Sequence, residues 1–121
     1  MFTMRRFVLI LLSVFLSGML YAQMDLIPYR KGNQWGFSDR NKKTIIPCQY
    51  NDTEPFKYGL AKVKIKQKYG LINPTGKLVL IAEYDNIAIH SEFVIVRKNG
   101  LKGVFDMNGK EILPVKYQEI E

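Results

Sequence analysis

The chain has 121 residues with 18 basic and 11 acidic side chains, a net charge of +7, one cysteine and one histidine. A single cysteine excludes an intramolecular disulfide, and one cysteine with one distant histidine excludes a zinc site made of protein ligands alone. The length corresponds to one domain.

The N-terminal segment predicts export. It reads "MFTMRRFVLILLSVFLSGMLYA", in which two arginines precede an apolar run from Phe7 to Leu20 and the small residue Ala22 ends the segment. This is the pattern of a secretory signal peptide at residues 1–22. The apolar run is shorter than the roughly 20 residues of a membrane-spanning helix. We expect cleavage before Gln23 and a periplasmic or secreted protein, with an uncleaved N-terminal anchor as the alternative.

Cleavage would leave residues 23–121 as a single domain without a membrane span. This domain would carry 16 basic against 11 acidic side chains, a net charge of +5. Such a charge attracts anionic partners over a long range. Alternatively, the charge serves only to keep the protein soluble. Export disfavours nucleic acid as a partner.

Three blocks of 25 residues align without a gap. They read "LIPYRKGNQWGFSDRNKKTIIPCQY" at 26–50, "LAKVKIKQKYGLINPTGKLVLIAEY" at 60–84 and "FVIVRKNGLKGVFDMNGKEILPVKY" at 93–117. Three positions are identical in every block: Gly36, Gly70 and Gly103; Lys43, Lys77 and Lys110; Tyr50, Tyr84 and Tyr117. A fourth is always basic: Arg30, Lys64 and Arg97. Internal repeats of this length indicate stacked supersecondary units.

Each block predicts three strands. In "LAKVKIKQK" the apolar residues alternate with lysines, which is typical of a half-buried strand. A hairpin turn follows at 32–33, 66–67 or 99–100, and a second strand follows at "WGFSD", "YGLIN" or "KGVFD". The third strand is "KTIIP", "KLVLI" or "KEILP".

The turn before the third strand has its own chemistry. It opens with Asp39, Asn73 or Asp106, whose side chains we expect to bond to their own backbone. Gly76 and Gly109 supply a left-handed residue, where the first block has Lys42. A lysine there costs about 1 kcal/mol, unless Asn41 takes the strain or the loop changes type.

These elements predict an all-β fold of three tandem three-stranded antiparallel meanders, about nine strands in total. One meander cannot bury its apolar face alone, so we expect the units to stack as a small solenoid or like propeller blades. The invariant glycines predict a bulge in the strand, or a place where another backbone segment or an aromatic ring approaches the strand closely. The invariant tyrosines predict rings buried against the next unit with satisfied hydroxyls.

The recurring pattern of aromatic-Gly-hydrophobic, Asp or Asn, a Gly-Lys turn, a hydrophobic pair, Pro and Tyr resembles the WG repeat, also called the KWG repeat. The resemblance covers residues 26–117. The signature Trp35 becomes Tyr69 and Lys102 in the later copies, and Ile81 replaces the proline of the other two. The resemblance implies a repeat scaffold without common catalytic chemistry, in a bacterial envelope context.

Catalytic and cofactor chemistry is not indicated. His90 stands beside Ser91 and Glu92, but neighbours on an extended strand point to opposite faces and cannot form a triad. The acids are dispersed, and no glycine turn precedes a helix as a phosphate loop would. We therefore expect no enzyme, cofactor or metal site, and Cys48 as a small buried hydrophobe.

Two features favour binding. One is the lysine row at 62, 64, 66 and 68, and the other is a set of aromatic rings. The candidate binding surface comprises Trp35, Arg30, Lys62, Lys64, Lys66, Lys68, Tyr69 and Arg97. Alternatively, the lysines form a solvated strand face that discourages aggregation, and the rings pack between units.

The leading hypothesis is a non-catalytic exported module that mediates protein–protein interaction in the bacterial cell envelope, with a partner that the sequence does not identify. The alternative is binding of envelope glycan or another anionic polymer through the basic and aromatic surface.

Overall fold

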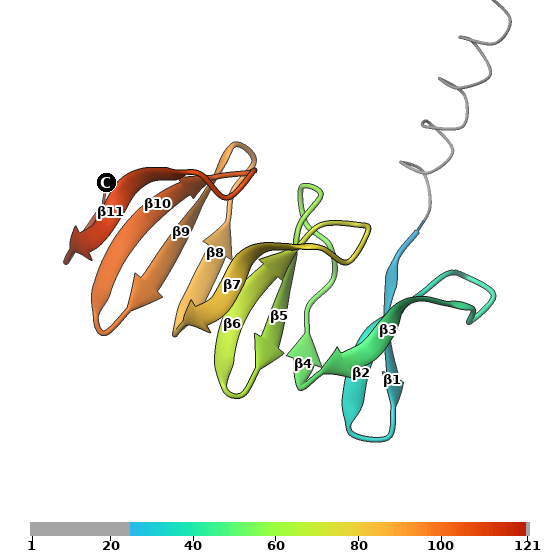
Figure 1. Cartoon of the computed structure of the whole chain (residues 1–121). Helices are drawn as coiled ribbons and strands as arrows, with labels where there is room; N and C mark the ends of the chain where they lie inside the picture. Colours follow the sequence, from blue (N-terminus) through green and yellow to red (C-terminus); the bar gives the residue numbers. More distant parts are fainter. Residues whose placement is uncertain (1–24, 121) are drawn as a thin grey trace, which may run out of the picture.

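The structure is a computed structural model that describes residues 25–120. This part of the chain consists of antiparallel strands in three sheets that follow one another along an array (Figure 1). Residues 25–120 contain no helix of the length and hydropathy that a membrane span requires. The predicted signal peptide lies outside the described residues. The prediction of an all-β repeat fold is confirmed.

Eleven strands make up the three units. Unit 1 has the strand order β1-β2-β3, unit 2 has β4-β5-β6-β7, and unit 3 has β8-β9-β10-β11. The strands are β1 (Ile27–Lys31), β2 (Gln34–Ser38), β3 (Thr44–Tyr50), β4 (Asp52–Thr53), β5 (Ala61–Ile65), β6 (Lys68–Ile72), β7 (Leu78–Tyr84), β8 (Asn86–Ile89), β9 (Phe93–Lys98), β10 (Leu101–Asp106) and β11 (Glu111–Tyr117).

The count of about nine strands was wrong, because the segments between the blocks also form strands. β4 pairs with β5, placing Asp52 opposite Lys64, and β8 pairs with β9, placing Asn86 opposite Arg97. β4 covers the outer edge of β5, and β8 covers that of β9, whose backbone groups would otherwise lack partners. Units 2 and 3 are therefore four-stranded sheets, whereas unit 1 has three strands.

Two apolar clusters lie between the units. The first joins Phe37, Ile46 and Tyr50 of unit 1 to Ala61, Val63 and Ile72 of unit 2. The second joins Leu60, Leu71, Leu80 and Tyr84 of unit 2 to Ile87, Val94 and Val96 of unit 3. Because Leu71 and Ile72 are neighbours on β6 but belong to different clusters, the central sheet is buried on both faces. We call the face that packs on the following unit the forward face, and the opposite one the rear face.

The invariant glycines lie where the third strand bulges across the second, as predicted. A Cβ atom at Gly36 would come within 2.3 Å of the Ile46 carbonyl oxygen, and one at Gly70 within 2.7 Å of the Leu80 carbonyl oxygen. The pairing register shifts at the same place in all three units. Ile81 lies in such a bulge and is exposed, which explains why the other blocks accept proline there.

The side chains that open the second turn act as predicted. The Oδ1 atom of Asp39 accepts hydrogen bonds from the backbone N–H groups of Asn41 and Lys43, at 2.8 and 2.9 Å. Asn73 and Asp106 make the same pair of bonds. Lys42 takes the left-handed conformation itself, with φ of 64°, so the loop keeps its type and carries the strain.

Candidate functional site

The basic and aromatic residues at the recurring positions are neighbours across strands. In unit 1, Arg30 lies opposite Trp35, and Trp35 lies opposite Tyr50. The Arg30 guanidinium lies 5.7 Å from the centre of the Trp35 ring. In unit 2 the Tyr69 ring takes the place of Trp35 and lies 5.6 Å from the Lys64 ammonium. These are cation–π contacts, so part of the basic charge is already held by the rings.

The four lysines do not form one row. Lys62 and Lys64 lie on β5, but Lys66 belongs to the turn, with φ of 49°, and Lys68 begins β6. Alternation alone predicted a continuous strand face, and the hairpin turn interrupts it. Arg97 lies apart from them, beside Lys102 on the forward face of unit 3.

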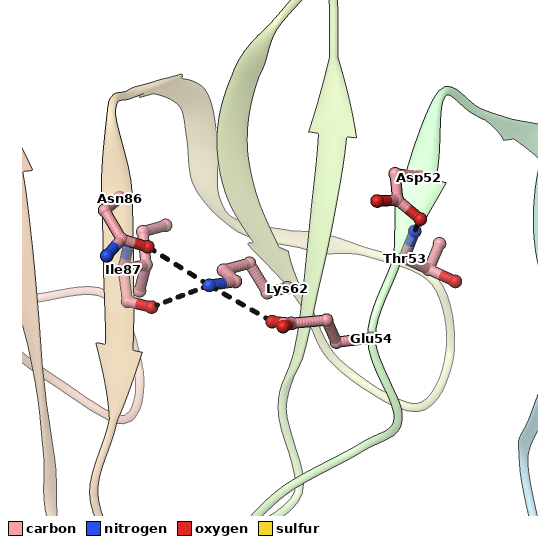
Figure 2. Close-up of polar contacts among 6 residues, drawn as sticks. All are labelled: Asp52, Thr53, Glu54, Lys62, Asn86 and Ile87. Carbon is pink, nitrogen blue, oxygen red and sulfur yellow. Dashed lines mark hydrogen bonds and ion pairs between the residues drawn. The ribbon is translucent and has the colours of Figure 1, made fainter.

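Lys62 links units 2 and 3 (Figure 2). Its ammonium donates to Asn86 Oδ1 at 3.1 Å and to the Ile87 carbonyl oxygen at 3.2 Å. It also pairs with the Glu54 carboxylate at 3.1 Å and lies 4.8 Å from the Tyr69 ring centre. Its side chain is only 15% exposed. The expected solvated lysine therefore contributes mainly to the contact between units.

Lys68 makes a second link between these units. Its ammonium pairs with Asp85, whose other carboxylate oxygen accepts a hydrogen bond from the Asn99 backbone N–H at 2.9 Å. The hydrogen bond from Lys68, followed by that from Asn99, lowers the pKa of Asp85 below its usual value.

A groove of about 500 Å³ lies between residues 54–57, which directly follow β4, and β8, and Lys62 is among its lining residues. We call it the groove between β4 and β8. Its lining is mainly apolar, with a few polar groups: Pro55, Phe56, Ile87, Ala88 and Ile89, and Glu54, Lys57, Lys62 and His90. Both β4 and β8 are edge strands of their sheets. Of the predicted surface residues, only Lys62 contributes here. The alternation in "NIAI" was the one sequence signal that could have indicated β8.

A second groove, of about 600 Å³, brings together three of the predicted residues, Trp35, Lys64 and Lys66. Asn51, Asp52 and Gln67 complete its lining. Within residues 25–120, neither Lys64 nor Lys66 is in an ion pair, in contrast to Lys62 and Lys68. The Asp52 carboxylate lies in the same groove, so its potential is mixed rather than uniformly positive.

Of the residues considered for catalysis, His90 lines the groove between β4 and β8, and Cys48 lies outside both grooves. His90 is exposed, and its ring stacks on Phe93 with 4.8 Å between ring centres. Cys48 is half-buried, and its Sγ donates to the Tyr29 carbonyl oxygen at 3.4 Å. In the part of the chain that the structure describes, no three His, Cys, Asp or Glu side chains gather where they could hold a metal ion.

Stacked meanders with shared cores define a tandem β-repeat protein. The sequence model of the WG containing repeat family matches residues 35–69, 69–101 and 103–121, which together are more than half of the chain. The protein therefore belongs to the WG containing repeat family, and the resemblance seen in the sequence is confirmed. No match was found among curated proteins or among solved structures.

Proposed function

We propose that the protein is a non-catalytic, exported β-repeat module that binds another protein of the bacterial cell envelope through the groove between β4 and β8. The observation that carries this proposal is the mainly apolar lining of a groove bordered by the edge strand β8 and by the segment that follows β4. An extended peptide segment binds such a place with its side chains in the apolar lining and with backbone hydrogen bonds to edge groups of β8 other than those of Ile87, whose N–H and C=O groups are bonded to Asn86 and Lys62.

The contacts inside the groove support a preformed site. The Lys62 ammonium connects Glu54 on one side to β8 on the other, and this holds the two units at a fixed separation. Ile87 is buried and Ile89 is half-buried, so the strand that offers its edge is anchored in the core. A rigid groove loses little conformational entropy when a partner binds.

Affinity purification from the cell envelope tests the proposal. The tagged protein should retain a specific protein partner, and Ala88→Arg should lose it, because Ala88 is exposed and lines the groove. Gln34→Arg is the matched control, since it adds the same side chain at an exposed strand position in unit 1. Equal retention by both variants would reject the groove as the binding site.

A second candidate function is binding of an anionic glycan or polymer in the groove that contains Trp35, Lys64 and Lys66. This function is favoured because, within residues 25–120, neither Lys64 nor Lys66 is in an ion pair. Retention on an anionic polysaccharide column should then weaken between low and physiological salt, because salt screens exposed charges. Lys64→Glu with Lys66→Glu should abolish retention. The control variant combines Lys77→Glu with Lys110→Glu, which make the same charge change at exposed turn residues. This control should reduce retention on the column only slightly.

A further inference from the structure

The contact between units occurs twice inside the chain, with the same positions on each side. The forward face of one unit presents a recurring set of large side chains: Leu26, Phe37, Ile46 and Tyr50 in unit 1, and Leu60, Leu71, Leu80 and Tyr84 in unit 2. The rear face of the next unit covers them with Ala61, Val63 and Ile72, or with Val94, Val96 and Phe105.

Unit 3 keeps this apolar forward face, but no further sheet within residues 25–120 packs on it, and of its members only Val104 is buried. Its members are Phe93, Val104, Leu113 and Tyr117. Phe93 is 37% exposed where Leu60 is 4% exposed, and Leu113 is 36% exposed where Leu80 is 5% exposed. An exposed apolar face of this kind indicates a surface that another molecule covers.

The residues after Tyr117 repeat the start of the strands that connect units. Asn51-Asp52-Thr53 and Asp85-Asn86-Ile87 follow the tyrosine of their blocks, and Gln118-Glu119-Ile120 follows Tyr117 at the same spacing. The first two segments leave their own unit and pair with the first strand of the next one. Residues 118–120 are not paired in any sheet of the described chain.

Unit 1 has the complementary gap. Within residues 25–120, β1 is an edge strand, whereas its counterparts β5 and β9 are covered by β4 and β8. The registers of the other units place Glu119 opposite Arg30 and Ile120 opposite Tyr29.

We propose that the forward face of unit 3, together with residues 118–120, binds the rear face and the β1 edge of unit 1 in a second copy of this chain. The copies then continue the repeat array head to tail. Such a heterologous contact produces rings or filaments rather than a closed two-fold dimer. This surface is separate from the groove between β4 and β8, so self-association does not depend on the proposed function.

The rear face of unit 1 can accept this contact. Ile27 is 44% exposed there. Ser38 and Cys48, two polar side chains of this face, donate their hydrogen bonds within unit 1, so covering the face leaves neither without a partner. Lys42 replaces the glycine that fits against the preceding unit in units 2 and 3, which makes this contact looser than the internal ones. Association should therefore depend on protein concentration.

Sedimentation equilibrium of the protein purified after expression of its full chain tests the proposal, up to about 1 mM. The wild type should associate beyond the dimer as concentration rises. Ile27→Asp and Leu113→Asp should each weaken association at least tenfold, because each removes one half of the contact. An equimolar mixture of the two variants should form a 1:1 complex and stop there, since one intact contact remains. Circular dichroism melting shows whether each variant is folded.

Glu119→Arg provides a second test at an exposed position, whose ion pair with Lys102 at 3.5 Å is a surface contact of small energy. It should weaken association at least tenfold by facing Arg30. Mixing it with Arg30→Glu should restore association beyond the dimer, because each contact between the two variants then joins an arginine to a glutamate. A wild type that stays monomeric overturns the proposal. So does wild-type association of the Ile27→Asp variant, which would indicate paired forward faces or a contact elsewhere. Loss of an envelope partner in the groove experiment has no bearing on these outcomes.

Discussion

Gly109 of unit 3 lies directly against Val79 of unit 2. A Cβ atom at Gly109 would come within 2.4 Å of the Val79 carbonyl oxygen. Gly109 also has φ of 86°, so glycine supplies both the left-handed conformation and the space for the preceding unit. The turn that opens with Asp106 thus packs unit 3 onto β7 of unit 2.

Gly109→Ala should lower the free energy of unfolding by about 2–4 kcal/mol, since it adds a backbone clash to the strain of positive φ. Gly100→Ala is the matched control, because Gly100 has φ of 79° and nothing within 4 Å of an added Cβ atom. The control substitution should lower the free energy of unfolding by only about 1 kcal/mol. Urea unfolding measures both. Equal losses would mean that the turn does not pack against Val79.

Lys42→Gly should raise the free energy of unfolding by about 0.5–1 kcal/mol. It relieves the left-handed strain at φ of 64°, although the added freedom of glycine in the unfolded chain offsets part of the gain. Lys42→Ala keeps the strain and removes only the exposed side chain, so it should be nearly neutral. A stabilisation by alanine equal to that by glycine would show that the lysine side chain, and not the backbone, is responsible.

Lys62→Met should destabilise the protein by about 1–3 kcal/mol, because it leaves Asn86 and the Ile87 carbonyl without the charged donor that joins units 2 and 3. Lys66→Met changes an exposed lysine in the turn and should shift stability by less than about 0.5 kcal/mol. Thermal unfolding of both variants beside the wild type is the measurement. Equal loss of thermal stability in the two variants would mean that Lys62 is solvated and does not join units 2 and 3.

Stability should fall at alkaline pH through Tyr84. Burial of its ring, followed by the charge of Glu83, raises the pKa of Tyr84 from 10.0 to about 12. Because the folded state holds the proton more tightly, the contribution is complete below pH 10 and is lost as the pH rises from 10 to about 12. Tyr84→Phe should show a shallower decline in urea unfolding over this window. Parallel curves for both proteins would contradict the shifted pKa.

The repeat, its turns and its glycine contacts could be predicted from the sequence, because the same local chemistry is written three times. Asp39, Asn73 and Asp106 satisfy nearby backbone groups, and such local bonds leave a fixed spacing in the sequence. The stacking of units also followed, since no single meander can bury its apolar face.

The connecting strands and the groove could not be predicted in the same way. β4 has two residues, too few to show an alternation. It forms because the edge of β5 offers backbone groups with which it can pair. Alternation assigned Lys62 to solvent, whereas a sheet between two others has both faces covered. The groove between β4 and β8 arises where two units meet, and that distance is set by packing between segments far apart in the chain.

Site-specific photo-crosslinking in the intact cell envelope tests the central claim most directly. A photoreactive residue at Ala88 should yield a discrete adduct with one protein, because this position is exposed and lines the groove. The same residue at Lys110, an exposed turn position outside the groove, should yield none. Equal adducts from both positions, or none from Ala88, would contradict a protein-binding groove between β4 and β8.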